Sequence, residues 1–286
     1  MELNKIFLNI KNVMLALLVL VGAFAFATSG SANLVHLLVA VITAVALDSA
    51  LFVFYKKQKL KFPDSALITG LIIGLVMSSI NPVYSALTAA IAILSKHVIR
   101  YNGKHVFNPG NFAVVLATFL YPAQAFQTWW ASANVFVTAG LGLVNVWRLK
   151  RWAMQATFLV PYVLLSLLIR PQPLENILGG TLFFFAFFMF IEPFTAPIFS
   201  EKARMVFGGL VAFFALAIDF GMLWGFPEAT KFGFPLALLL ADLFVPFLNK
   251  KFPMAPSPAS PSPSQPSTAS AVLASTAKHV AKAAKK

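Results

Sequence analysis

The feature that most constrains this chain is the placement of its positive charge, because short clusters of Lys and Arg recur between long apolar runs. Positive residues resist translocation, so the cytoplasmic loops of membrane proteins collect them. With about ten spans and a cytoplasmic N-terminus, every Lys and Arg except Arg170 and Lys231 falls in a cytoplasmic segment. A different number of spans would scatter these clusters over both sides. The pattern therefore predicts ten spans with both termini in the cytoplasm.

Composition supports a membrane environment for most of the chain. Hydrophobic residues make up 59% of the 286 positions and charged residues 11%, with a mean hydropathy of +0.81. A soluble core of this length cannot hide so much apolar surface, so lipid must act as solvent. We expect a multi-pass protein of a prokaryotic plasma membrane. The predicted spans are 13–27, 34–54, 65–77, 83–94, 107–120, 133–146, 153–168, 177–190, 205–218 and 234–248.

Several of these runs are shorter than the ~20 residues that an upright helix needs to cross a bilayer. Short, broken or tilted helices are therefore expected in an all-α membrane fold. The predicted organisation is a cytoplasmic N-terminus (1–12), a transmembrane domain (13–248) and a disordered cytoplasmic tail (249–286) rich in Pro, Ser and Ala. The tail is either simply solvated or docks on anionic lipid or an acidic partner. Together with the basic loops it accounts for the net charge of +13, so no nucleic-acid partner is expected.

The two parts of the transmembrane domain, 13–120 and 133–248, resemble each other weakly. Ile80-Asn81-Pro82 follows the third run and Ile191-Glu192-Pro193 the eighth, while a Lys, a Phe and a Pro open both the fifth run (104–109) and the tenth (231–235). Because each half has an odd number of spans, such a repeat must be inverted in the membrane. Inverted repeats with broken helices place their site near the midplane, between the halves.

The polar segment 95–112, SKHVIRYNGKHVFNPGNF, interrupts two apolar runs and is the first candidate site. Irregular backbone at membrane depth has to be buried in protein or line a cavity. The second candidate segment is the proline-broken sequence FIEPFTAPIF, residues 190–199. The predicted contacts to a cofactor are Lys104, His105, Phe107, Asn108, Pro109, Gly110, Asn111, Glu192, Pro193 and Thr195.

Acidic side chains near the bilayer are costly and so are informative. Asp48 lies about two turns inside the second predicted span, where it is either an ion or proton ligand or the partner of a basic residue from a neighbouring loop. Glu192 lies beside a proline break and is the second residue of a candidate ion or proton path. His36, near the outer end of the second span, where that span begins, is expected to be a hydrogen-bonded structural residue rather than a ligand.

The chain has no cysteine, which excludes Cys-ligated iron–sulfur clusters on it. Its four histidines do not form a pair suited to haem, so any electron transfer requires an organic cofactor. The aromatic run FFFAFFMF at 183–190 either faces lipid, packs helices together, or walls a flavin or quinone. Trp129 and Trp130 are typical of anchors at the membrane interface.

Three segments keep the order and spacing of one family's motifs: PDSALITGLIIGL (63–75), SKHVIRYNGKHVFNPGNFAVV (95–115) and FMFIEPFTAPIF (188–199). They resemble the membrane subunit family shared by the sodium-pumping NADH:quinone reductase and the Rnf electron-transport complex. The resemblance covers about 34–248 and implies ten spans in inverted halves. It also implies a role in passing electrons through a flavin, coupled to cation transport, within a complex of other membrane and redox subunits.

Members of this family carry FMN linked to threonine in a Ser-Gly-Ala-Thr motif, and this chain departs from that pattern. The corresponding loop reads YPAQAFQTWWAS (121–132), with Thr128 as its only threonine. We therefore expect FMN or riboflavin to be bound noncovalently. Two other functions remain open from the residues alone: a solute or ion transporter without redox chemistry, and a membrane anchor for a soluble reductase.

Overall fold

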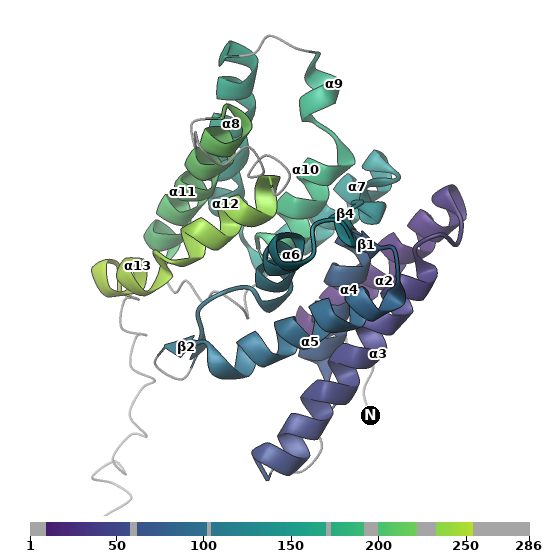
Figure 1. The fold of residues 1–286 in the computed structure, drawn as a ribbon. Coiled ribbons are helices and arrows are strands. Elements are labelled where there is room, and N and C mark those ends of the chain that lie inside the picture. The colour runs from purple at the N-terminus through teal and green to yellow at the C-terminus, as the bar shows by residue number, and fades with distance from the viewer. Residues whose placement is uncertain are drawn as a thin grey trace, which may run out of the picture. The chain divides into compact units, whose positions relative to one another are not determined.

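The computed structural model describes residues 10–57, 62–101, 104–169, 173–191, 200–221 and 233–253. Each of the ten predicted apolar runs is mainly helical within this part of the chain (Figure 1). The α-helices are α2 (Ile10–Ser29), α3 (Leu34–Ala50), α4 (Asp64–Val76), α5 (Pro82–Val98), α6 (Pro109–Leu120), α7 (Val135–Leu149), α8 (Trp152–Ile169), α9 (Leu174–Ile177), α10 (Gly180–Phe184), α11 (Glu201–Asp219), α12 (Gly233–Asp242) and α13 (Val245–Lys251).

Shorter elements extend or connect these helices. The π-helix η1 (Leu51–Tyr55) continues α3, and the π-helix η3 (Phe185–Met189) continues α10. A 3-10 turn, η2 (Trp130–Ser132), precedes α7. Strand β1 (Met77–Ser79) pairs antiparallel with β4 (Ala125–Gln127), and β2 (Arg100–Tyr101) with β3 (Lys104–His105). The fold is thus helical, with two small ladders that the sequence did not predict.

The helix starts follow from side chains that satisfy the first free backbone N–H groups. Asn81 accepts from the backbone of Val83 before α5, and Asn108 accepts from Asn111 before α6. In both cases proline occupies the first turn, where its missing N–H costs nothing. Asn134 caps α7 and Ser200 caps α11 in the same way.

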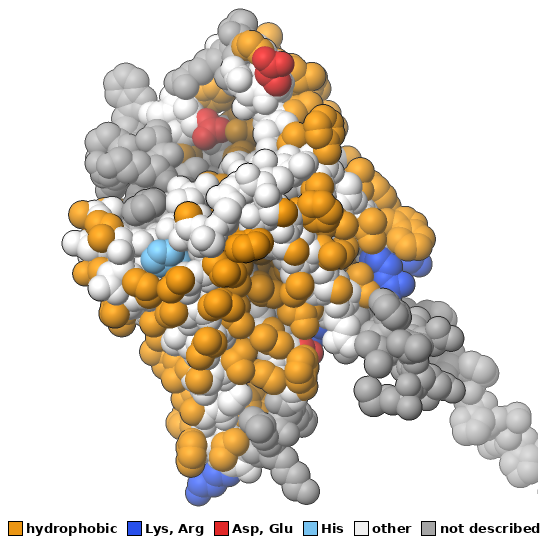
Figure 2. Space-filling view, turned by 90° about the vertical axis from the view of Figure 1, so that its right-hand side faces the viewer, with side chains coloured by type: hydrophobic (Ala, Val, Ile, Leu, Met, Phe, Trp, Pro, Cys, Tyr) orange, Lys and Arg blue, Asp and Glu red, His pale blue; other side chains and the backbone are white. Residues whose placement is uncertain are grey.

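Helix length and exposed apolar surface identify a multi-pass membrane protein. Among the described residues, three helical segments are long and apolar enough to cross a bilayer: 10–29, 34–55 and 152–169. The pair α12 and α13, bent by 45°, raises that number to four if it forms one broken span. The expected short helices are also present, since α4 has 13 residues and α6 has 12. Hydrophobic side chains cover much of the face shown in Figure 2.

Two glycines let α3 and α4 pack at backbone contact distance. A Cβ added at Gly70 would lie 2.6 Å from the Cα of Val41, and one added at Gly74 would clash with the Cα of Leu37. Small residues four apart allow such close approach between membrane helices, where van der Waals contact replaces the hydrophobic effect. The motif 63–75 therefore has a structural role in joining these helices.

Hydrogen bonds join three connecting segments, which follow α2, α4 and α6. β1, after α4, pairs with β4, after α6. The side chain of Asn33, between α2 and α3, lies 3.5 Å from the hydroxyl of Thr128. Nearby, the ring of His36 lies 3.2 Å from the hydroxyls of both Ser79 and Ser85. His36 is therefore hydrogen-bonded, as expected from the sequence.

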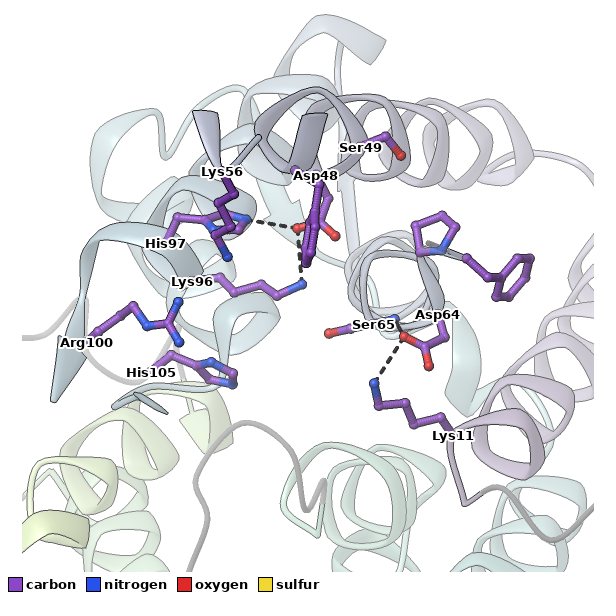
Figure 3. A pocket seen from close by; sticks show the side chains of 13 residues that line it. Lys11, Asp48, Ser49, Lys56, Asp64, Ser65, Lys96, His97, Arg100 and His105 are labelled. Carbon is purple, nitrogen blue, oxygen red and sulfur yellow. Dashed lines mark hydrogen bonds and ion pairs between the residues drawn. The ribbon is translucent and has the colours of Figure 1, made fainter. Parts of the chain in front are cut away.

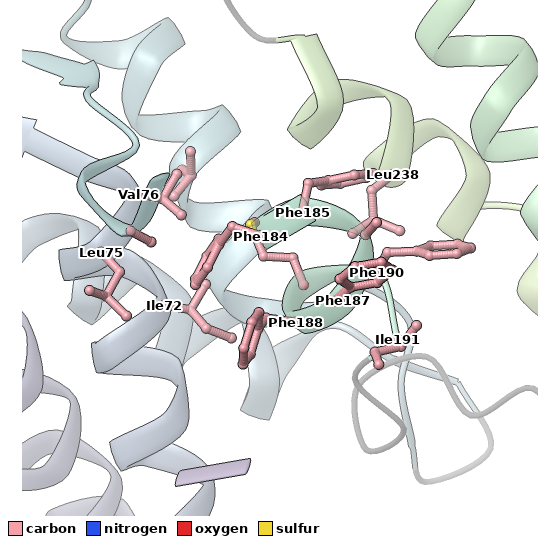
Figure 4. Close-up of a cluster of buried hydrophobic side chains, with 14 of the residues drawn as sticks. Ile72, Leu75, Val76, Phe184, Phe185, Phe187, Phe188, Phe190, Ile191 and Leu238 are labelled. Atoms are coloured by element: carbon pink, nitrogen blue, oxygen red, sulfur yellow. The ribbon is translucent and has the colours of Figure 1, made fainter. Parts of the chain in front are cut away.

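The phenylalanine run 183–190 lies in the core of the protein. Phe184, Phe185 and Phe188 are fully buried (Figure 4). Phe185 also stacks on Phe234 of α12, with ring centroids 4.8 Å apart. The helix-packing interpretation of this run is confirmed for these residues, and the lipid-facing interpretation is wrong for them, because their side chains are buried inside the protein. The expectation for Trp130 is wrong, because its side chain is only 5% exposed and packs in the same core.

Candidate functional site

The polar segment 95–112 contributes to two distinct polar regions. Its first part lines a cavity of about 460 Å³, which we call the basic pocket (Figure 3). The lining side chains come from the start of α2, the end of α3 with η1, the start of α4, and the end of α5 with β2 and β3. They are Lys11, Asp48, Ser49, Phe52, Lys56, Phe62, Pro63, Asp64, Ser65, Lys96, His97, Arg100 and His105.

Asp48 is paired with two basic residues of α5. Its carboxylate lies 2.9 Å from Nε2 of His97 and 3.2 Å from Nζ of Lys96, and the residue is 3% exposed. A buried carboxylate needs such partners, because desolvation would otherwise favour its neutral form. Of the two roles expected for Asp48, this geometry matches pairing with a neighbouring basic segment.

A second ion pair lies across the pocket, where Lys11 contacts Asp64 at 3.1 Å. Lys56 lies over the ring of Phe52, with Nζ 4.7 Å from the centroid. Partial burial lowers the pKa of Lys56, and the like charges of Arg100 and Lys96 add to this effect while Asp48 opposes it. The pocket is thus a site where positive charges crowd one another.

The second polar region surrounds the N-terminus of α6, where Asn108 is 2% exposed. Its side-chain oxygen accepts from the backbone N–H of Asn111 at 3.0 Å, and its amide donates to the carbonyl of Met189 at 3.3 Å. Its own backbone N–H donates to Asp242 at 3.1 Å. Asn108 therefore caps one helix and joins it to η3 and α12.

Asn111, in the first turn of α6, is fully buried and also contacts α12. Its amide donates to the carbonyl of Pro235 at 2.9 Å. Gly110 packs against Ile72 of α4, since a Cβ at this position would lie 3.5 Å from the Cγ2 of Ile72. The openings of the fifth and tenth predicted spans, which the weak repeat had matched, are in direct contact.

Three amide side chains donate to carbonyls of the π-helix η3. Besides Asn108 at Met189, Asn145 of α7 donates to Phe187 at 2.8 Å and Gln155 of α8 donates to Ala186. A π-helix shifts the backbone pairing and is enriched at functional sites. Sequence reasoning missed Asn145 and Gln155, although a lone amide in an apolar run was a usable signal.

The other predicted contacts are distributed as follows. His105 lines the basic pocket, while Phe107 stacks on Phe112 with centroids 5.4 Å apart. Pro109 occupies the first turn of α6, and Lys104 lies in β3. The candidates Glu192, Pro193 and Thr195 lie outside the described residues.

Thr128, the only threonine of the loop 121–132, is held by the neighbouring connections. Its backbone N–H donates to the carbonyl of Val76 at 2.9 Å, and its hydroxyl is the group that Asn33 approaches. The side chain is exposed. The backbone of the loop therefore stays hydrogen-bonded to the end of α4 just beyond the β1–β4 ladder, since Thr128 and Trp129 both donate to the carbonyl of Val76.

Comparison with known proteins gives relatives that share one name. The D subunit of the ion-translocating oxidoreductase complex of Mannheimia succiniciproducens is 33% identical over 42% of this chain and 34% of its own length. The protein of the same name from Cronobacter sakazakii is 25% identical over 77% of this chain and 86% of its own length. That of Shewanella sediminis is 34% identical over 44% of this chain and 36% of its own length.

The first of these alignments spans only about a third of the relative's length. The family comparison reaches further, because a model of the NQR2, RnfD, RnfE family matches residues 4–143 and 125–256. These two ranges contain all three sequence motifs and every helix that the structure describes. The chain belongs to the NQR2, RnfD, RnfE family.

Proposed function

We propose that this chain is the membrane subunit of an ion-translocating electron-transport complex related to Rnf, in which electrons pass through a flavin and drive cation transport. The observation that carries this proposal is family membership across both halves of the transmembrane region. The names of the relatives state that their complex translocates ions and is an oxidoreductase. That this chain takes part in the same activity is our inference. Its partners are then the other membrane and redox subunits of the complex, with quinone as a candidate acceptor.

The proposed topology is ten spans in two inverted halves, with both termini in the cytoplasm of a prokaryote. The contacts of the first half support it. Lys11, Lys56 and Arg100, from three segments expected on the cytoplasmic side, line one pocket. The three connections expected outside meet at the β1–β4 ladder and at the contact between Asn33 and Thr128.

The second half offers a similar observation on its basic connections. Burial and the like charge of Arg204 lower the pKa of Arg151 to about 10. Arg151 precedes α8 and Arg204 lies in the first turn of α11. These two segments belong to different loops that are both expected in the cytoplasm. Their closeness therefore agrees with the proposed alternation of sides.

The flavin is proposed to be noncovalent FMN or riboflavin, which supplies the electron-carrying chemistry when bound. The α6 opening does not fit a flavin ring in the conformation described. The backbone N–H groups of Asn108 and Asn111 and both of their side-chain amides already donate to protein acceptors. A flavin at this place must therefore displace at least one of these bonds.

The candidate ion path also involves a side chain that already has partners. Asp48 already binds Lys96 and His97, so a cation that used its carboxylate would have to displace one of them. Glu192 remains the other proposed member of the path. The basic tail is proposed to dock on anionic lipid, which would hold the soluble part of the chain near the membrane.

Affinity purification of the tagged full-length chain from its native membrane tests the function. We expect other redox subunits and flavin in the eluate, and cation uptake driven by electron transfer after reconstitution. Asn108→Ala and Glu192→Gln should leave insertion intact but reduce flavin retention or ion uptake. A colourless protein that moves a solute without a reductant would instead favour a transporter without redox chemistry. A colourless protein that only retains a soluble reductase would favour the anchor.

A further inference from the structure

Helices α8 and α11 lie side by side and run in the same direction, which brings their N-terminal ends together (Figure 1). Near these ends, a Cβ added at Gly208 of α11 would lie 2.6 Å from the carbonyl oxygen of Met154 in α8. Further along both helices, the hydroxyl of Tyr162 in α8 donates to the carboxylate of Asp219 in α11 at 2.6 Å. Because the contacts advance along both helices together, their first turns are neighbours.

An arginine lies at each of these neighbouring helix ends. Arg151 lies three residues before Met154, and Arg204 lies four residues before Gly208. Each arginine is therefore about one helical turn from the contact between the helices, toward the same end. Burial lowers the pKa of Arg151, and the positive charge of Arg204 adds to this effect. The packing of the helices and the electrostatics thus agree that the two guanidinium groups lie close together.

Neither guanidinium has a carboxylate partner in the part of the chain that the structure describes. Arg151 contacts the sulfur of Met154 at 3.9 Å, and Nε of Arg204 donates to the carbonyl of Ser200 at 3.4 Å. Glu201, the acidic residue nearest to Arg204 in the sequence, is exposed and pairs with neither of them. A guanidinium that is partly withdrawn from water is stabilised by an anion, because desolvation penalises its charge.

An exposed apolar face of α8 begins next to Arg151. Trp152 is 50% exposed, and Val160, Leu164 and Leu168 are exposed at successive turns of the same helix. Since α8 is long and apolar enough to cross a membrane, this face is expected to contact acyl chains. A half-exposed tryptophan at the end of such a helix is typical of the membrane interface. The neighbouring guanidinium groups are then near the level of the phospholipid phosphates.

The charges at this place favour an anionic phospholipid over a zwitterionic one. A guanidinium presents a planar fork that binds phosphate oxygens in pairs. Phosphatidylcholine brings its own cation into the site, and two nearby guanidinium groups repel that cation. Phosphatidylglycerol carries the same phosphodiester without a positive group. Basic clusters between membrane helices bind such anionic headgroups.

We propose that Arg151 and Arg204 together bind the phosphate of an anionic phospholipid, whose acyl chains lie along the exposed face of α8. The occupant is a membrane lipid rather than a soluble phosphate compound, because an apolar face adjoins the charges. The site is independent of the proposed electron transfer, since it rests on the packing of α8 against α11 and on the charges at their N-terminal ends. A chain without any flavin would still bind the lipid here.

Native mass spectrometry of the full-length protein measures which lipid it keeps. The protein is placed in nanodiscs that contain equal amounts of phosphatidylglycerol and phosphatidylcholine, and the lipids that stay bound after release are counted. We expect the wild type to retain phosphatidylglycerol in preference to phosphatidylcholine. Arg151→Gln with Arg204→Gln should weaken this retention about tenfold or more, because the charge-assisted hydrogen bonds of two guanidinium groups are lost.

Matched variants separate the guanidinium pair from the local positive charge. Lys150→Gln with Lys202→Gln removes the same charge from exposed residues that lie within two positions of the pair in the sequence. This control should retain phosphatidylglycerol much as the wild type does. Arg151→Lys with Arg204→Lys keeps the charge but removes the planar forks, so its retention should fall between that of the wild type and that of the double Gln variant.

Thermal unfolding in detergent is a second readout that does not depend on nanodiscs. A ligand that binds only the folded state raises the unfolding midpoint. Added phosphatidylglycerol should raise the midpoint of the wild type more than added phosphatidylcholine does, and this difference should disappear in the arginine-to-glutamine variant. Without added lipid, the midpoint of that variant should not fall below the wild-type value, because the substitutions break no ion pair among the described residues.

Equal retention of the two lipids by the wild type overturns the proposal, as does an equal loss in the arginine and lysine variants. Should the double arginine variant not fold, Arg204→Gln alone is measured, and an unchanged preference for phosphatidylglycerol in that protein contradicts the proposal. The pair could instead contact an acidic segment of another subunit. Unchanged lipid retention with loss of partner subunits from the native-membrane complex would show this and overturn the lipid site.

Discussion

Asn111 and Pro235, 124 residues apart, are joined by a hydrogen bond of 2.9 Å from the asparagine amide to the proline carbonyl. The bond links the first turns of α6 and α12, which open corresponding spans of the two proposed halves. Asn111 is fully buried, so water is not a substitute donor for this carbonyl. The contact therefore joins the start of α6 to the start of α12.

Removing the Asn111 amide should destabilise the packing of α6 against α12. Asn111→Ala leaves a buried carbonyl without its partner, which costs about 1–3 kcal/mol. Thermal unfolding in a mild detergent should therefore show a lower midpoint than the wild type. Thr28→Ala serves as a comparison away from the contact between α6 and α12, because this exposed hydroxyl bonds only within its own helix. An unchanged midpoint for Asn111→Ala would mean that the carbonyl finds another donor.

The capping and joining functions of Asn108 are separable. Asn108→Ser keeps an oxygen that can cap α6 but loses the amide that donates to Met189. Asn108→Ala loses both, and we expect it to be less stable than the serine variant by about 1 kcal/mol. Equilibrium unfolding of the two variants measures this difference. Equal stability would show that the cap contributes little.

Asp48 should behave as a structural residue. Breaking a buried ion pair by removing one partner costs roughly 3 kcal/mol, so Asp48→Asn should be markedly less stable. Lys96→Met in the Asp48→Asn background should restore part of the loss, because the buried charge left behind is removed. The measurement is a double-mutant cycle on thermal stability. If Asp48→Asn unfolds like the wild type but stops ion uptake, the carboxylate is an ion ligand instead.

Some of this arrangement follows from local sequence. The Asn-Pro pair at 108–109 predicts a capped helix start, and the charge pattern placed Asp48 near basic loops. The pocket itself did not follow, because it is assembled from four segments whose approach depends on tertiary packing. The role of Asn145 could not be predicted either. Its acceptor, the carbonyl of Phe187, belongs to a π-helix, and no local sequence pattern indicates that π-helix.

The close approach of α3 and α4 should tolerate no side chain at Gly74. A methyl group there would overlap the backbone of Leu37, so Gly74→Ala should destabilise the protein by about 1–3 kcal/mol. Gly140→Ala is the matched control, because a Cβ at Gly140 meets no atom within 4 Å. Thermal midpoints of the two variants in the same detergent provide the comparison. A loss at both glycines would indicate an effect other than packing.

The proposed topology is testable by labelling, since the natural chain has no cysteine. Single cysteines at Lys57 and Lys202 should react with a membrane-impermeant maleimide only after the cells are opened. Those at Ser31 and Glu175 should react in intact cells. All four positions are exposed in the structure, so burial does not explain a lack of reaction. Labelling of Lys57→Cys in intact cells would contradict the ten-span arrangement.

The absorption spectrum of the full-length protein, purified in mild detergent, tests the central claim most directly. We expect the visible bands of an oxidised flavin that dithionite bleaches, with the flavin released into solution by acid denaturation. Release is expected because the loop 121–132 has no Ser-Gly-Ala-Thr sequence. Flavin fluorescence that stays with the protein on a denaturing gel would contradict noncovalent binding. A protein that has no visible absorption in either redox state would contradict the redox function itself.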